Sequence, residues 1–268
     1  MKVAKAYFWP RWFYDSLPVE KQKNIPKNLV IKLQRANLYL WQALNIYDDF
    51  LDGNGQAQKL PDANNHFRKF LEIYYRQNFP SDYYYLFNQV LTDLEAANRQ
   101  EVLGLTARDY QTISLKNLSR KSLALGLGPL ALLSYSGYRI DDSRCQTTLN
   151  FFRYALAAKQ LSDDARDWAE DLNANKITIV NSPINKFLLA SHLKYQTLDQ
   201  CPEANLFFAR RVAPRLIKNL AKLISLARRE AQRAGWSPAN RLADALLAPL
   251  ETGVSETTYF LKLLRQKT

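Results

Sequence analysis

One long stretch without helix-breaking residues limits what this chain can fold into. Residues 28–52 contain neither proline nor glycine. Their apolar side chains recur at steps of three, four or seven residues, the spacing of one helix face: Leu29, Leu33, Leu40, Leu44 and Tyr47. Gly53 and Gly55 follow directly, and glycine commonly ends a helix. The pattern therefore predicts a helix over residues 28–52.

The rest of the chain repeats this kind of pattern. Further helices are predicted at residues 63–78, 82–102, 106–136, 141–173, 183–196, 203–234 and 238–266. Eight glycines in 268 residues are too few for a turn-rich β-sandwich or a glycine-loop nucleotide fold. The loops are short, and no internal repeat or linker interrupts the chain. We therefore expect an all-α protein in which residues 1–268 form a single domain.

No feature of the sequence indicates export or membrane insertion. Cys145 and Cys201 lie far apart without the spacing of a zinc site or a disulfide framework. The most apolar segment, residues 123–133, is interrupted by Gly126, Gly128 and Pro129 and is shorter than the roughly 20 residues that span a bilayer. We expect a buried, bent helix there. We also expect no signal peptide, and a cytoplasmic protein.

The net charge of +12 implies an anionic partner. The strongest basic run follows a helical apolar pattern and comprises Arg210, Arg211, Arg215, Lys218, Lys222, Arg228, Arg229 and Arg233. An amphipathic helix with a solvated basic face explains this run, and peripheral contact with an anionic membrane is the alternative. We do not expect a nucleic-acid partner.

Two clusters of aspartates carry the candidate chemistry. Asp48, Asp49 and Asp52 close the helix predicted over residues 28–52. Three carboxylates near the negative end of a helix dipole repel one another and cost up to about 1 kcal/mol each. The placement therefore calls for a compensating cation, and hard carboxylate oxygens suit Mg²⁺.

The second cluster strengthens this interpretation. Asp163, Asp164, Asp167 and Asp171 again follow a long apolar helical pattern, and three of the four are spaced by four residues. Carboxylates on two facing helices can hold metal ions between them in a bundle. Two such helices imply a shared magnesium site, with Asp48, Asp52, Asp163 and Asp167 as the preferred ligands.

The second cluster resembles a motif of the trans-isoprenyl diphosphate synthases, which belong to the class I isoprenoid synthase superfamily. The matching residues are Gln160, Asp163, Asp164, Asp167, Asp171, Leu172 and Lys176, while Lys159 stands where that family has phenylalanine. The same run is also similar to squalene and phytoene synthases, at Gln160, Leu161, Ser162, Arg166, Asp167, Glu170 and Asp171. Lys121-Ser122 resembles a Lys-Thr pair that contacts diphosphate in the trans-prenyltransferases.

This resemblance implies an antiparallel helical bundle of the isoprenoid synthase type around a central apolar cavity. It implies that magnesium binds to carboxylates of both clusters: Asp48, Asp49, Asp52, Asp163, Asp164, Asp167 and Asp171. It also implies a diphosphate held by Lys121, Gln160, Arg166 and Lys176, for each of which a surface ion pair or hydrogen bond is the alternative. Leu44 and Trp41, which lie one and two turns before Asp48, are candidates for the pocket floor, with ordinary core packing as the alternative.

The expected activity is a magnesium-dependent prenyl transferase that ionises an allylic prenyl diphosphate and joins it to an acceptor such as isopentenyl diphosphate. The chain lacks the Arg-Arg pair and the Gly-Gly-Lys-x-x-Arg stretch that bind diphosphates in that family. A terpene synthase, a squalene- or phytoene-type head-to-head synthase and a non-catalytic helical partner subunit therefore stay open. A homodimer is a further expectation from the resemblance.

Overall fold

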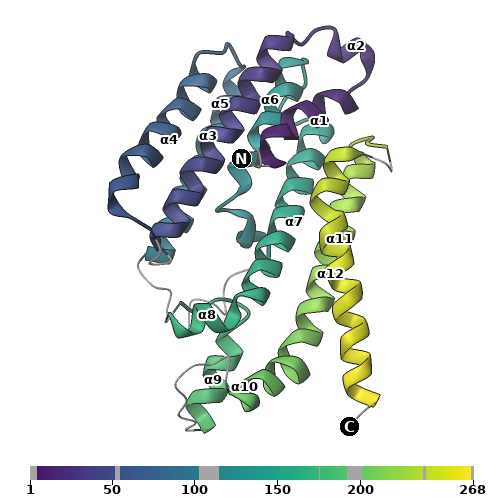
Figure 1. Ribbon diagram of the computed structural model, residues 1–268. Helices are drawn as coiled ribbons and strands as arrows, with labels where there is room; N and C mark the ends of the chain where they lie inside the picture. The colour runs from purple at the N-terminus through teal and green to yellow at the C-terminus, as the bar shows by residue number, and fades with distance from the viewer. Residues whose placement is uncertain are drawn as a thin grey trace. The chain divides into compact units, whose positions relative to one another are not determined.

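The computed structural model contains only helices and connecting segments in the part of the chain that it describes (Figure 1). The described residues are 5–51, 55–102, 115–174, 176–191, 201–237 and 240–266. The all-α expectation is confirmed. The chain divides into two compact units, each described by itself below. Unit 1 comprises residues 1–102, 120–152 and 229–245, and unit 2 comprises residues 103–119, 153–228 and 246–268. A single domain over residues 1–268 stays a prediction.

Unit 1 is built around one long helix. Its described elements include α1 (Trp9–Ser16), α2 (Val19–Gln22), α3 (Lys27–Leu51), α4 (Leu60–Tyr75), α5 (Ser81–Val102), α6 (Leu127–Tyr135) and the first part of α7 (Ser143–Arg166). Helix α3 packs mainly against α4, as Figure 1 shows. Its bounds differ by one residue at each end from the predicted helix over residues 28–52, because Gly53 and the polar residues after it follow the last apolar turn.

Aromatic and amide side chains fix the core of unit 1. Tyr74, Tyr83 and Phe87 are fully buried next to one another. Asn37 on α3 is also fully buried, and its Nδ2 donates hydrogen bonds to the carbonyl oxygens of Ala6 (3.1 Å) and Leu125 (2.9 Å). One amide thereby connects three segments that are distant in the sequence. Loss of either hydrogen bond would leave a buried group without a partner, which costs about 1–3 kcal/mol.

The predicted helix over residues 106–136 is confirmed only at its end in the described part. Residues 115–119 and 123–126 form 3₁₀ turns, and the α-helix begins only at Leu127. A Cβ on Gly126 would lie 2.8 Å from Cγ of Phe152, and a Cβ on Gly128 would lie 2.8 Å from Cγ of Pro10. The backbone approaches its neighbours too closely there for a side chain. A 3₁₀ turn that leads into α6 takes the place of the bent helix expected over residues 123–133.

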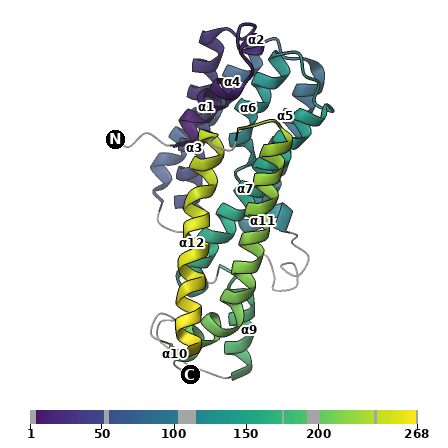
Figure 2. The same ribbon diagram turned by 90° about the vertical axis from the view of Figure 1, so that its right-hand side faces the viewer.

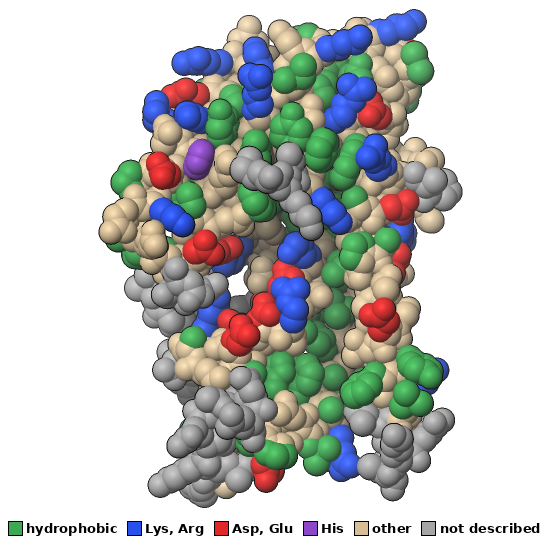
Figure 3. All heavy atoms as spheres, viewed as in Figure 1, with side chains coloured by type: hydrophobic (Ala, Val, Ile, Leu, Met, Phe, Trp, Pro, Cys, Tyr) green, Lys and Arg blue, Asp and Glu red, His purple; other side chains and the backbone are tan. Residues whose placement is uncertain are grey.

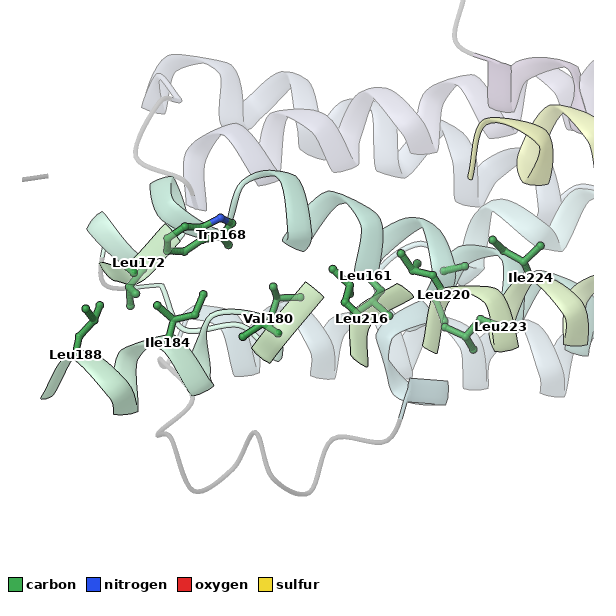
Figure 4. Packing of buried hydrophobic residues seen from close by; sticks show 14 of the residues in the cluster. Leu161, Trp168, Leu172, Val180, Ile184, Leu188, Leu216, Leu220, Leu223 and Ile224 are labelled. Carbon is green, nitrogen blue, oxygen red and sulfur yellow. The ribbon is translucent and has the colours of Figure 1, made fainter. Parts of the chain in front are cut away.

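Unit 2 is formed by the later helices. Its described elements include the rest of α7, α8 (Trp168–Asn173), α9 (Ser182–Ser191), α10 (Pro202–Phe207), a π turn (Phe208–Val212), most of α11 (Ala213–Arg233) and most of α12 (Arg241–Gln266). In unit 2, α11 and α12 run side by side (Figure 2), joined by the ion pair of Arg228 with Glu251 at 2.9 Å. Figure 4 shows the buried leucines, isoleucines and valine that form the core of this unit.

Candidate active site

The first acidic cluster lies in the last turn of α3. Its only described ion pair joins Asp48 Oδ1 to Lys121 Nζ at 3.0 Å. Sequence analysis predicted both residues for the site, and unit 1 brings them together. Lys121 reaches Asp48 from the segment that precedes the 3₁₀ turn at residues 123–126. An ammonium group here offsets part of the repulsion between the carboxylates and the carbonyl end of α3.

Asp49 lies at the exposed end of α3. The Asp49 side chain is exposed, and Asp52 lies outside the described residues. The backbone at Gly55 lies against the end of α3. A Cβ on Gly55 would lie only 2.5 Å from Cα of Phe50. Glycine at this position therefore lets the backbone of the loop touch the backbone that carries the carboxylates.

The candidate pocket residues on α3 are half-buried. Trp41 and Leu44 both belong to this class, so neither is wholly enclosed in the core of unit 1. Their role as a pocket floor stays a prediction. Tyr47, next to Asp48, donates a hydrogen bond to Oδ1 of Asn64 at 2.6 Å, and partial burial raises the pKa of its phenol.

The second acidic cluster is covered by the chain's own donors. Lys159 Nζ lies 2.5 Å from Asp163 Oδ2, and Arg166 bridges Asp163 (3.3 Å) and Asp167 (3.0 Å). Its hydrogen bond to Asp167, and then the charges of Asp167 and Asp163, raise the pKa of the Arg166 guanidinium. The surface ion pair considered for Arg166 is therefore present. Lys159 was not predicted as a site residue, although its place four residues before Asp163 allows such a pair on a helix.

Buried and partly buried carboxylates complete the second cluster. Asp164 is buried and accepts a hydrogen bond of 2.7 Å from Nε2 of Gln160. Asp171 lies 3.8 Å from Nζ of Lys176. All of these predicted residues belong to unit 2, which groups them in pairs along the end of α7, α8 and the residues after it.

The predicted helix over residues 141–173 is interrupted within the motif. Helix α7 ends at Arg166, α8 begins at Trp168, and Asp167 between them has φ −99° and ψ 12°. Asp171 therefore lies on a different helix from Asp163 and Asp164. This break could not be predicted from the sequence, because neither glycine nor proline stands near it.

The carboxylates suit magnesium by their chemistry. Hard oxygen donors are the ligands that Mg²⁺ prefers. Within the described ranges, no three His, Cys, Asp or Glu side chains lie close enough together to hold a metal ion. Asp48, Asp163 and Asp167 instead face lysine or arginine nitrogens, which a metal ion would displace. The set of seven metal ligands stays a prediction.

The basic run forms an exposed face along the π turn and α11. Its exposed members are Arg210, Arg211, Arg215, Lys218, Lys222, Arg229 and Arg233. Lysine and arginine side chains are spread over the face of the molecule in Figure 3, with acidic side chains beside several of them. No helix in the described part of the chain is long and apolar enough to cross a membrane. Peripheral membrane contact stays a prediction.

The fold matches that of a solved enzyme structure. A geranylgeranyl pyrophosphate synthetase from the archaeon Geoglobus acetivorans superposes with a TM-score of 0.62, over 91% of this chain and 84% of that chain. The fold is that of a trans-isoprenyl diphosphate synthase. Sequence identity over this isoprenoid synthase fold is 13%, so the likeness is one of fold alone. No family model matches the chain, and no curated protein is significantly similar to it in sequence.

Proposed function

We propose that this protein is a magnesium-dependent prenyl transferase that ionises an allylic prenyl diphosphate and joins it to an acceptor such as isopentenyl diphosphate. One observation carries the proposal: in an isoprenoid synthase fold, two aspartate clusters lie at the carbonyl ends of α3 and α7. Each carboxylate there is disfavoured by a few tenths to about 1 kcal/mol. Binding of a cation, and of a diphosphate through it, would explain why carboxylates stand at these unfavourable positions.

The proposed ligands are carboxylates of both clusters, with Asp48, Asp52, Asp163 and Asp167 as the first choices. When bound, magnesium would neutralise diphosphate oxygens and so favour departure of the diphosphate. Lys121 and Arg166 already lie against these carboxylates, at 3.0 Å from Asp48 and 3.0 Å from Asp167.

The basic side chains have a second task in this proposal. If a metal ion bound their carboxylate partners, Lys121, Arg166 and Lys176 would become available to bind the diphosphate. Guanidinium and ammonium groups stabilise the negative charge that develops on a leaving phosphate oxygen. Gln160 is a neutral donor beside them. The same residues that neutralise the clusters in the metal-free protein would thereby hold the leaving group.

The test is turnover of prenyl diphosphates by the purified protein. The protein is incubated with magnesium and geranyl or farnesyl diphosphate, with and without isopentenyl diphosphate. Pyrophosphate is assayed, and extracted products are analysed by mass spectrometry. Longer prenyl diphosphates that form only with isopentenyl diphosphate are the expected result. Hydrocarbons or alcohols from farnesyl diphosphate alone would instead assign a terpene synthase or head-to-head synthase.

Matched aspartate variants identify the site. We expect Asp48→Asn and Asp163→Asn to lower pyrophosphate release at least a hundredfold, since each removes a charge near the leaving group, where such losses reach about 3–4 kcal/mol. Asp93→Asn is the control, because Asp93 lies outside both clusters at 3.9 Å from Arg120. Equal activity in all three variants would refute the proposed site. No turnover by the folded wild-type protein would favour a non-catalytic partner subunit.

A further inference from the structure

Unit 2 contains a cavity that the proposed reaction does not use. Its volume is about 300 Å³. Its walls are the flank of α7, residues 179–183 and one face of the π turn and α11. Figure 4 shows Leu161 and Leu216 pointing toward one another between α7 and α11, with Val180 next to them. Leu161 follows Gln160 by one residue, so its side chain points about 100° around α7 from that of Gln160.

The cavity has apolar walls and a basic rim. The apolar lining residues are Leu161, Ile179, Val180, Pro183, Phe207, Val212 and Leu216. The polar ones are Arg211, Arg215 and Asn219. These three follow one another at four-residue steps, which places them along one side of the helix. An apolar hollow bordered by a row of hydrogen-bond donors matches a ligand with an apolar chain and an anionic head.

In the part of the chain that the structure describes, the arginines on the rim, Arg211 and Arg215, have no acidic partner. The sequence contains no Asp or Glu between Ala204 and Arg229. Like charges four residues apart on a helix repel one another by a few tenths of a kcal/mol. An anion between the two guanidinium groups would remove this repulsion. A phosphate suits this place, because a guanidinium group can donate two parallel hydrogen bonds to two phosphate oxygens.

The backbone at the rim is also unusual. Arg211 belongs to the π turn Phe208–Val212, which lies between α10 and α11. Single π turns are rare, and they occur frequently at functional sites. Here the turn sets the register between Phe207, which lines the cavity from α10, and the donors on α11.

We propose that this cavity binds a single-chain amphipathic phosphate. Arg211 and Arg215 bind the phosphate oxygens, Asn219 donates beside them, and the apolar walls hold the chain. A water-sized group takes up about 30 Å³, so the cavity has room for about ten such groups. A chain of about eight carbons therefore fits. The site lies within unit 2 and does not depend on the function proposed for the aspartate clusters.

The test is calorimetric titration of the full chain with octyl phosphate in buffer that contains EDTA. Chelation of metal ions separates this test from the proposed magnesium chemistry. We expect saturable binding with one molecule per chain. Octanol and inorganic phosphate, which lack the head or the chain, are expected to bind at least about tenfold more weakly.

Variants on the rim assign the site. Arg211→Gln and Arg215→Gln are each expected to weaken octyl phosphate binding about tenfold, the usual effect of losing a charged hydrogen bond. Lys218→Gln on the same helix is the control, since Lys218 is exposed but does not line the cavity. Ile179→Trp fills the hollow from a turn and is expected to abolish binding. Thermal denaturation verifies that each variant is folded.

Two outcomes would overturn the proposal. The first is no binding of octyl phosphate to the folded protein. In that case, sedimentation with phosphatidylcholine vesicles that contain phosphatidic acid would assign the arginines to a bilayer surface. The second is equal loss of binding in Lys218→Gln and Arg211→Gln, which would indicate attraction to the whole basic face.

Discussion

Single residues decide how the second aspartate cluster is neutralised. Asp163 faces two cations, Lys159 at 2.5 Å and Arg166 at 3.3 Å. The Lys159 side chain is 56% exposed, so its pair with Asp163 is a surface ion pair that contributes little to the stability of the fold. It nevertheless occupies an oxygen that the proposed metal ion needs. Lys159 would therefore compete with the proposed magnesium ion for the cluster.

Removal of this competitor gives the residue-scale prediction. We expect Lys159→Ala to bind magnesium about two- to fivefold more tightly than the wild type, because an exposed ion pair contributes about 1 kcal/mol or less. The measurement is a magnesium titration followed by thermal denaturation, without substrate. Lys186→Ala is the matched control, since Lys186 is exposed in α9 and forms no ion pair with a described residue. An unchanged magnesium midpoint in Lys159→Ala would contradict the competition.

The effect of replacing a helical glycine by alanine on stability depends on how closely the neighbouring element packs against it. Alanine normally stabilises a helix by about 1 kcal/mol relative to glycine. At Gly128 in α6 the new Cβ would lie 2.8 Å from Pro10 and 3.3 Å from Oδ1 of the buried Asn37. We therefore expect Gly128→Ala to lower the free energy of unfolding by about 1–3 kcal/mol, as overpacking does. Urea unfolding measures this loss.

A glycine in an open helix supplies the comparison. A Cβ on Gly253 in α12 would meet no atom within 4 Å. Gly253→Ala is expected to raise the free energy of unfolding by up to about 1 kcal/mol. Stabilisation by both substitutions would show that α6 can move away from Pro10, and the close approach would then not be required.

The elements also show what the sequence predicts and what it leaves out. Long helices with a clear apolar face, such as α3 and α12, were placed within a few residues. Helix α1 was missed because its eight residues, with Pro10 in the first turn, are too few to show a period. The aspartates were found because their type and spacing are local. Their partners Lys121 and Arg166 were proposed for a diphosphate, and only the fold shows which carboxylates they face.

Unit 1 contains buried groups that resist losing a proton at alkaline pH. Burial, followed by the charges of Asp142 and Asp82, raises the pKa of the Cys145 thiol to about 12. Burial also raises the pKa of Tyr74 and Tyr83 in the same unit. Alkaline pH is therefore expected to destabilise unit 1.

The sign of this effect follows from proton binding. Above about pH 9 the unfolded thiol loses its proton while the folded thiol keeps it, so stability falls as pH rises toward the folded pKa. Below about pH 8 this contribution is constant. Between about pH 9 and 10 the thiol alone is expected to remove about 1 kcal/mol. Urea unfolding of Cys145→Ala should show a correspondingly shallower fall of stability with pH than the wild type. Equal slopes in the two proteins would refute the assignment.

The π turn at Phe208–Val212 has a consequence for chain length. A π turn holds one residue more than the α turn it replaces, so one residue of this segment is not needed for a continuous helix. Deleting Ala209 would let α10 and α11 merge into one regular helix, with the downstream leucines Leu216, Leu220 and Leu223 still facing the core. The flanking helices would keep their facing, so Phe207 would still line the cavity. The chain can therefore absorb a one-residue deletion here without losing a cavity wall.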